Sequence, residues 1–488
     1  MVDAVVVGAG PNGLSAAVVL ARAGLSVQVV ERAGTVGGGA RTREVTLPGY
    51  RHDTGSAVHP MALASPFFRA FDLPAHGVDL LQPEVAYGHP LDGGRAALAL
   101  RDLEATAAGL GRDGDRWRAL LGPLVRRWES VVDVALGDMR SLPPHLLRAG
   151  SAAALLGAAV LEQGGPGWNL RWRTEEAAAL LTGVAVHAIA PPRGLGPAGA
   201  GLVLAVLAHA VGWPVPAGGT QTISDALAAD LRAHGGRITT GVEVTDLREL
   251  PGAAAVLLDV APAGLLRLAA GRLPDRYVGA VRRYRHGGAA APVHFALSGP
   301  VPWAARGLDR AGTIHLGGSR AQLVSAEDAV ARGRHAPEPY VLVSQPSVVD
   351  PSRAPAGHHV LWTYAHVPHG SARDVGDLVQ RQVERFAPGF SDLVLARHSL
   401  SAQDLAADDP TLVGGDVACG ATTPWQLVFR PVPRWDPYRV PLEGVYLCSA
   451  ATSPGPGVHG LSGVNAARRV LRQRFGTVVG RDGLTPPR

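Results

Sequence analysis

Residues 3–42 constrain the fold more strongly than any other part of this chain. Three glycines there follow the spacing G-x-G-x-x-G, between an apolar run that predicts a buried strand and an Ala/Leu/Val-rich run that predicts a helix. In such a turn the first glycine permits a sharp bend, the second lets a pyrophosphate approach the backbone, and the third lets the helix pack on the strand. The pattern predicts a dinucleotide-binding strand–helix–strand unit, with an ordinary glycine-rich turn as the alternative. The glycines are Gly8, Gly10 and Gly13.

Glu31 ends a second predicted strand, residues 26–30, about twenty residues after the glycine turn. A carboxylate at this place accepts hydrogen bonds from ribose hydroxyls and disfavours a 2′-phosphate, so it favours FAD or NAD over NADP. A second glycine turn, Gly37–Gly39, follows and leads to Arg41. This second turn resembles that of FAD-binding flavoproteins with two dinucleotide-binding domains, and it favours FAD.

The composition limits the classes of protein that remain. With 488 residues, 47 % of them hydrophobic, the chain can form roughly two to four domain-sized units around a large core. Two cysteines, Cys419 and Cys448, form no disulfide framework and no metal motif, so we expect no metal and a cytoplasmic location. The net charge of +5 comes without an arginine-rich run interleaved with aromatics. Nucleic acid is therefore not the expected partner, whereas peripheral contact with an anionic membrane surface stays open.

All 46 basic residues are arginine, and the sequence contains no lysine. Schiff-base chemistry and a lysine general base are therefore excluded. Amine-oxidising flavoenzymes of related fold commonly use a lysine to hold a water near the flavin N5, so the sequence argues against amine oxidation.

The middle of the chain is expected to be mostly helical. Residues 61–175 show broken amphipathic periods at Ser65–Phe71, Trp117–Leu136 and Leu146–Glu162. Residues 194–221 carry no charge, and their prolines disfavour a membrane-spanning helix. We expect a buried helix there, covering an apolar substrate cavity, with a shallow insertion into the membrane as the alternative.

The later segments alternate between two kinds of pattern. A helix over Thr222–His234, strands within 237–260 and a strand–loop–helix over 445–474 continue the dinucleotide domain, whereas four strands within 293–363 predict one antiparallel sheet. The predicted fold class is α/β: a Rossmann-like FAD-binding domain with an inserted substrate domain of mixed antiparallel sheet and helices. Residues 1–75, 215–265 and 441–478 form the discontinuous FAD-binding domain, and residues 76–214 and 266–440 form the substrate domain.

Several longer stretches resemble one family. The N-terminal block, RTREVTLPGYRHDTGSAVHP, GWPVPAGG, GGRITTGVEV, RFAPGF, FRPVP and SPGPGVHGLSGVNAA are similar to phytoene desaturase-like FAD-dependent oxidoreductases, in the branch related to pyridine nucleotide-disulphide oxidoreductase domain protein 2. The resemblance implies FAD, with the backbone of Val244 at the adenine end and residues 457–459 near the isoalloxazine. Together with the motifs above, the predicted cofactor-binding residues are Gly8, Gly10, Pro11, Asn12, Gly13, Glu31, Arg32, Gly38, Gly39, Ala40, Arg41, Gly55, Ser56, Ala57, Val244, Ser449, Gly457, Val458 and His459.

The expected activity is C–C dehydrogenation of an apolar isoprenoid- or polyketide-like substrate. Flavin N5 would accept a hydride, a base would remove the neighbouring proton, and oxygen or a quinone would reoxidise the flavin. Histidine titrates near neutral pH, so the predicted bases are His59, His459 and His294, in that order. A flavin-dependent polyene isomerase and a non-catalytic FAD-fold protein that binds a lipid or a partner are the alternatives.

Overall fold

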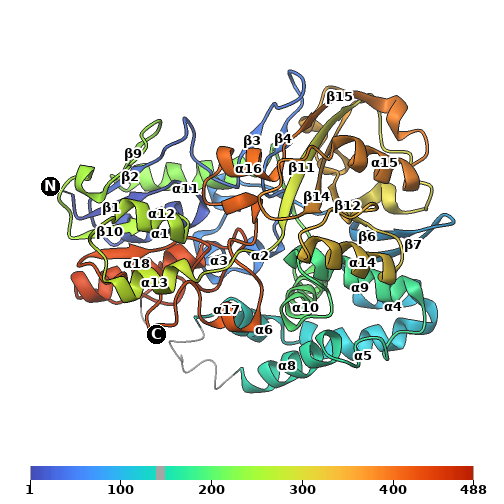
Figure 1. Cartoon of the computed structure of the whole chain (residues 1–488), viewed down its shortest axis with the longest axis horizontal. Helices are drawn as coiled ribbons and strands as arrows, with labels where there is room; N and C mark the ends of the chain where they lie inside the picture. Colours follow the sequence, from blue (N-terminus) through green and yellow to red (C-terminus); the bar gives the residue numbers. More distant parts are fainter. Residues whose placement is uncertain (1, 139–148, 487–488) are drawn as a thin grey trace.

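The computed structural model describes residues 2–138 and 149–486. A five-stranded parallel sheet with the order β16-β10-β1-β2-β9 brings together strands from both ends of the chain and from its middle. It lies on the left of Figure 1. Its strands are β1 (Ala4–Val7), β2 (Val27–Val30), β9 (Arg237–Thr239), β10 (Ala255–Leu258) and β16 (Val445–Leu447).

Helices cover both faces of this sheet, and this explains why the central strands β1 and β10 are apolar throughout, whereas the edge strand β9 is polar and largely exposed. Alternate side chains of β1 belong to two different buried clusters: Val6 packs with one group of helices, and Val5 packs with the other. The first group is α1 (Pro11–Arg22), α11 (Gln221–Ala233) and α18 (Leu461–Arg474), and the second is α12 (Pro262–Leu268) and α13 (Asp275–Arg282). The α/β fold class with a Rossmann-like domain is therefore confirmed.

A second sheet has seven strands in the order β15-β11-β14-β13-β12-β6-β7. Neighbouring strands are antiparallel except for β12 and β6, which are parallel. The four strands expected within 293–363 are all present in it. Its strands are β6 (Val85–Leu91), β7 (Arg95–Leu100), β11 (Ala289–Leu297), β12 (Ala311–Leu316), β13 (Val341–Ser344), β14 (His359–Val367) and β15 (Val394–Ser399). Helices α14 (Arg320–Ala331) and α15 (Gly376–Phe386) pack near it.

The hairpin formed by β6 and β7 corrects the expectation of a mostly helical segment from residue 61 to 175. Strand β7 is rich in Ala and Leu, which also favour a helix, and β6 contains a proline, which is unusual within a strand. Neither was therefore recognised as a strand from the sequence. The turn between them, Asp92-Gly93-Gly94, places both glycines at positive φ (+80° and +73°). A short Asp-Gly turn of this kind is a strong local hairpin signal, and the helix prediction overlooked it.

The expected helix over Trp117–Leu136 is two helices, α5 (Gly114–Val125) and α6 (Trp128–Ala135). The chain leaves helical angles between them, where Arg127 has φ −121° and ψ 25°. The expected helix from Leu146 begins within residues that lie outside the described part, and its described portion is α8 (Gly150–Gly164).

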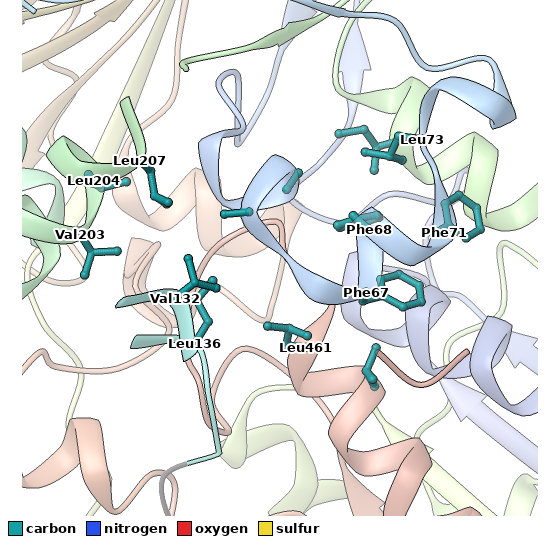
Figure 2. Packing of buried hydrophobic residues seen from close by; sticks show 14 of the residues in the cluster. Phe67, Phe68, Phe71, Leu73, Val132, Leu136, Val203, Leu204, Leu207 and Leu461 are labelled. Carbon is teal, nitrogen blue, oxygen red and sulfur yellow. The ribbon is translucent and has the colours of Figure 1, made fainter. Parts of the chain in front are cut away.

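Helix α10 (Leu195–Ala210) lies buried within the helical block, as its uncharged sequence predicts. Figure 2 shows Val203, Leu204 and Leu207 of α10 facing Val132 and Leu136 of the α6 segment, near side chains of α3 (Pro66–Phe71) and α18. In the described part of the chain no helix is both long and apolar enough to cross a bilayer. Peripheral contact with a membrane surface stays a prediction. The other elements are α2 (Pro60–Ala64), α4 (Leu103–Gly109), α9 (Glu175–Ala185), α16 (Ala402–Asp408), α17 (Pro424–Val428), β3 (Thr42–Arg43), β4 (His52–Asp53), β5 (Leu80–Leu81) and β8 (Val215–Pro216).

Candidate functional site

A cavity of about 540 Å³ opens at the carboxyl edge of the parallel sheet. Its wall includes the turn after β1, the end of β2, the end of β10 and the loop that follows β16. Ligands of open α/β sheets bind at this edge, and the volume falls within the roughly 300–1,000 Å³ of small-molecule sites. Residues from both ends of the chain therefore face one space.

Most of the predicted cofactor residues line this cavity. Four of them do not: Gly13, Ala40, Ala57 and His459. Gly13 lies behind the turn, where an added Cβ would come within 2.2 Å of the Gly8 carbonyl oxygen, so it serves helix packing rather than contact with a ligand. The predicted residues in the wall are Gly8, Gly10, Pro11, Asn12, Glu31, Arg32, Gly38, Gly39, Arg41, Gly55, Ser56, Val244, Ser449, Gly457 and Val458.

The two glycine turns touch each other at the cavity wall. Gly8 has φ +102°, and a Cβ on Gly38 would lie 3.1 Å from the Gly10 Cα. A Cβ on Gly8 or Gly10 would lie 2.7 or 2.9 Å from oxygen atoms of Asp259, so the close packing of this wall requires glycine. The bare backbone at the amino end of α1 suits the close approach of an anionic pyrophosphate. These residues fit the phosphate part of a dinucleotide.

Glu31 is held rigidly at the end of β2. Its Oε2 accepts a hydrogen bond from the Ala9 N–H at 2.7 Å, and its Oε1 accepts one from the Ala33 N–H at 2.8 Å. Each carboxylate oxygen retains a second lone pair, so both can still accept from hydroxyl groups in the cavity. The arrangement fits a ribose, as the spacing from the glycine turn predicts.

Arg41 positions the second glycine turn. Its side chain is buried, its Nε donates to the Gly38 carbonyl oxygen at 2.7 Å, and its guanidinium contacts Asp408 at 2.9 Å. Arg43 pairs with the same carboxylate at 2.7 Å. Two arginines therefore fasten the end of α16 to the cavity wall, and the Arg41 charge is already compensated by a protein carboxylate.

Asp259, which the sequence analysis did not select, follows β10 and lies in the cavity wall. Its Oδ2 accepts from the Gly13 N–H at 2.8 Å. Burial raises the pKa of Asp259 to about 7, against the Gly13 hydrogen bond and with help from the Asp409 and Glu31 carboxylates. A carboxyl directly after an apolar strand was the only local signal in the sequence, and its place beside the glycine turn follows from the fold.

The three predicted bases lie outside the cavity wall. His59 Nε2 lies 2.9 Å from Thr220 Oγ1, which itself donates to the Ser56 carbonyl oxygen, and burial lowers the pKa of His59 to about 4. His459 is bonded through both ring nitrogens, to the Leu461 N–H and to the Gly455 carbonyl oxygen, and burial lowers its pKa to about 4 as well.

His294 lies on β11 and packs edge-on against His52, with ring centroids 5.2 Å apart. Burial holds the pKa of His294 well below its usual value. Neither of its ring nitrogens has a hydrogen-bonding partner among the described residues. The catalytic role of these three histidines stays a prediction.

A different histidine does line the cavity. His286 Nδ1 lies 3.1 Å from Asp416 Oδ2, and His286 stacks on His369. Asp416 is fully buried and is itself held by the backbone N–H groups of Gly287, Ala418 and Gly420. A carboxylate bonded to Nδ1 fixes the ring and leaves Nε2 as the free basic nitrogen. No spacing rule links residue 286 to residue 416, so the sequence carried no signal for this pair.

The fold is shared with oxidoreductases of known structure. A putrescine oxidase triple mutant aligns with 97 % of this chain and 99 % of its own, with a TM-score of 0.61 and 17 % identity. An oxidoreductase from Methanosarcina mazei aligns with 96 % of this chain and all of its own, with a TM-score of 0.56 and 17 % identity. At such identities the likeness concerns the fold alone.

Comparison of sequences gives one matching family model and several similar proteins. Residues 6–72 match the family model described as NAD(P)-binding Rossmann-like domain. The chain is 29 % identical to pyridine nucleotide-disulfide oxidoreductase domain-containing protein 2 of Rattus norvegicus, over 96 % of this chain and 93 % of the relative. It is also 29 % identical to phytoene dehydrogenase of Streptomyces griseus, over 96 % of this chain and 95 % of that protein. The predicted resemblance to phytoene desaturase-like FAD-dependent oxidoreductases is confirmed.

Proposed function

We propose that this protein is an FAD-dependent oxidoreductase that desaturates a largely apolar, isoprenoid- or polyketide-like substrate. The observation that carries the proposal is the single cavity bordered by the N-terminal glycine turns and by Ser449, Gly457 and Val458 near the C-terminus. The similarity to a phytoene dehydrogenase along nearly the whole chain supports the reaction class.

Different groups of cavity residues would hold different parts of the proposed cofactor. The glycine turns and the amino end of α1 would hold the pyrophosphate, Glu31 the ribose, and Val244 the adenine end, whereas Gly55, Ser56 and residues 457–458 would border the ring. When bound, FAD would supply a hydride acceptor, with oxygen or a quinone as the final electron acceptor.

We propose His286 as the base, in place of the three histidines that lie outside the wall. Asp416 holds its Nδ1, so Nε2 is the nitrogen available to take a proton from a substrate in the cavity. A positioned base of this kind contributes about 10²–10⁴ in rate.

Anaerobic titration of the purified yellow protein tests the proposal. We expect a polyene to bleach the flavin band and to emerge with an added double bond. A primary amine should leave the band unchanged, because the chain has no lysine. His286→Gln should slow bleaching at least about 100-fold, whereas His59→Gln and His294→Gln should change it little.

The opposite outcomes are equally clear. A protein that refuses FAD and takes up another nucleotide contradicts the cofactor assignment. A polyene that is isomerised without net oxidation points to the isomerase, and a colourless protein that binds lipid points to the non-catalytic alternative. Bleaching by an amine contradicts the argument from lysine, and equal loss in His59→Gln and His286→Gln contradicts the choice of base.

A further inference from the structure

A carboxyl group lies over the glycine turn at the place where a phosphate is expected. The Asp259 side chain reaches the turn from the end of β10, and its Oδ2 would lie 2.9 Å from a Cβ on Gly10 and 3.0 Å from a Cβ on Gly13. In dinucleotide-binding turns the pyrophosphate approaches the backbone at the second glycine. Asp259 therefore borders the space that the pyrophosphate of the proposed cofactor would enter.

Asp259 already occupies one of the N–H groups at the amino end of α1. Its Oδ2 accepts from the Gly13 N–H at 2.8 Å. The first N–H groups of a helix are the donors that hold a bound anion, so the carboxyl group and a phosphate would meet at the same helix end. Asp259 lines the cavity, and its Oδ1 has no hydrogen bond among the described residues. Oδ1 is thus the oxygen that can bond to a ligand.

The charges that act on Asp259 are negative. Burial raises its pKa to about 7 against the Gly13 hydrogen bond, and the Asp409 and Glu31 carboxylates act in the same direction as burial. Asp409 follows α16 directly and faces the second glycine turn, since its Oδ2 would lie 3.8 Å from a Cβ on Gly38. A pyrophosphate would add further negative charge here, and nearby negative charge favours the protonated form of a carboxyl group.

The arginines near the glycine turns are bonded to other groups. Arg41 and Arg43 both pair with Asp408, at 2.9 and 2.7 Å. Arg32 donates to the backbone carbonyl oxygens of Ala407 and Asp408. These three cations therefore do not compensate a charge on Asp259.

The other titratable groups around Asp259 supply no cation either. Burial raises the pKa of the Cys419 and Cys448 thiols, which face it, so both stay neutral. Arg267 of α12 and His286 lie in the cavity wall, but neither forms an ion pair with Asp259 in the described part of the chain. A proton is therefore the counter-charge that lets this carboxyl group lie beside a phosphate.

We propose that Asp259 is a proton-linked contact of the dinucleotide site, which takes up one proton from solvent when the pyrophosphate binds and donates it as a hydrogen bond from Oδ1 to a phosphate oxygen. The inference rests on the proposed function for the identity of the cofactor. It predicts that the cofactor binds more weakly as the pH rises.

Release of FAD from the full-length holoprotein tests the inference. The return of flavin fluorescence on dilution gives the dissociation constant at each pH, and the pyrophosphate diester itself does not titrate between pH 6 and pH 8. Because binding needs the protonated form of a group that titrates near pH 7, the dissociation constant should rise about tenfold from pH 6 to pH 8. Calorimetry at pH 8, in buffers of different ionisation enthalpy, should show about one proton taken up per FAD bound.

Variants assign the proton to Asp259. Asp259→Asn keeps the shape and a donor but does not titrate, so it should bind tightly at pH 8 and change less than about twofold between the two pH values. Asp259→Ala should also lose the pH effect, and it remains informative if Asp259→Asn fails to fold. Two controls should keep the full effect: His286→Gln removes a titratable group of the same wall, and Asp246→Asn makes the same change in an exposed pair.

Several results would overturn the inference. They are equal binding of FAD at both pH values, no uptake of a proton, a full pH effect in both Asp259 variants, or loss of the effect in His286→Gln. Tight binding at pH 8 that requires added Mg²⁺ would overturn it as well, because a metal cation would then compensate the carboxylate in place of a proton.

Failure of the inference is separable from failure of the proposed function. NAD carries the same pyrophosphate and is measured beside FAD. Proton-linked binding of NAD by a protein that refuses FAD leaves the role of Asp259 standing and removes the flavoenzyme. Binding of FAD without a pH effect does the reverse, and a protein that binds neither dinucleotide contradicts both.

Discussion

At the scale of single residues, Asp259 shows how the surroundings of a side chain change its pKa. An aspartate in an extended chain loses its proton near pH 4. Here burial beside the glycine turn raises the pKa to about 7. The folded state therefore holds the proton more tightly than the unfolded state does. The stabilisation linked to this proton is complete below about pH 4, and it is lost as the pH rises through about 7.

We therefore expect Asp259→Asn to stabilise the protein more at pH 8 than at pH 5, because the amide does not titrate. The difference in unfolding midpoint between variant and parent, measured at the two pH values, checks this. Asp246→Asn is the control: hydrogen bonds from Arg248 lower the pKa of Asp246 to about 2, so its effect should be the same at both pH values. An Asp259→Asn effect that does not change with pH would refute the assignment.

At the scale of elements, the contact between α1 and α18 joins the two ends of the chain. A Cβ on Gly463 of α18 would lie 1.9 Å from the Asn12 carbonyl oxygen of α1. Gly463→Ala should therefore force the helices apart and destabilise the protein by about 1–3 kcal/mol or more. Denaturant unfolding measures the loss.

Gly157→Ala provides the comparison on α8. No atom lies within 4 Å of the added Cβ there, so the same substitution should stabilise by about 0.5–1 kcal/mol through helix propensity. If Gly463→Ala proved as stable as Gly157→Ala, the close approach of α1 and α18 would be wrong.

At the scale of the whole molecule, Arg353 and Asp53 tie the sheets together. Both side chains are fully buried and paired. Asp53 of β4 also accepts from the Thr220 N–H at the start of α11, and Arg353 lies in the segment between β13 and β14. The pair thus links the N-terminal segment, the dinucleotide-binding helices and the seven-stranded sheet.

Arg353→Met should cost about 3–5 kcal/mol of unfolding free energy, because it leaves a buried carboxylate without a cation. Adding Asp53→Asn should recover part of the loss. Arg248→Met breaks an exposed pair with Asp246, which water already screens, and should therefore cost far less. Urea unfolding of the four proteins compares these effects, and a loss in Arg353→Met as small as that in Arg248→Met would contradict the proposed link.

The features predictable from the sequence are those that depend on local conformation. Gly8, Gly10 and Glu31 could be placed because a turn with positive φ and a carboxylate at a set distance leave a local signature. Apolar runs in the same way predicted β1, β10 and β16. The hairpin of β6 and β7 was missed because Ala and Leu suit a helix equally well and because the turn signal of Asp92-Gly93-Gly94 between the strands was overlooked.

The remaining parts of the site depend on contacts between distant segments. His286 meets Asp416 and Asp259 meets Gly13, and neither pair has a spacing that a sequence motif records. Local backbone conformation depends on neighbouring residues. For that reason the sequence alone was enough to predict a dinucleotide-binding turn. Burial decides which cavity a side chain lines, which group it bonds to and what pKa it has. A side chain becomes buried only once the sheets and helices have packed.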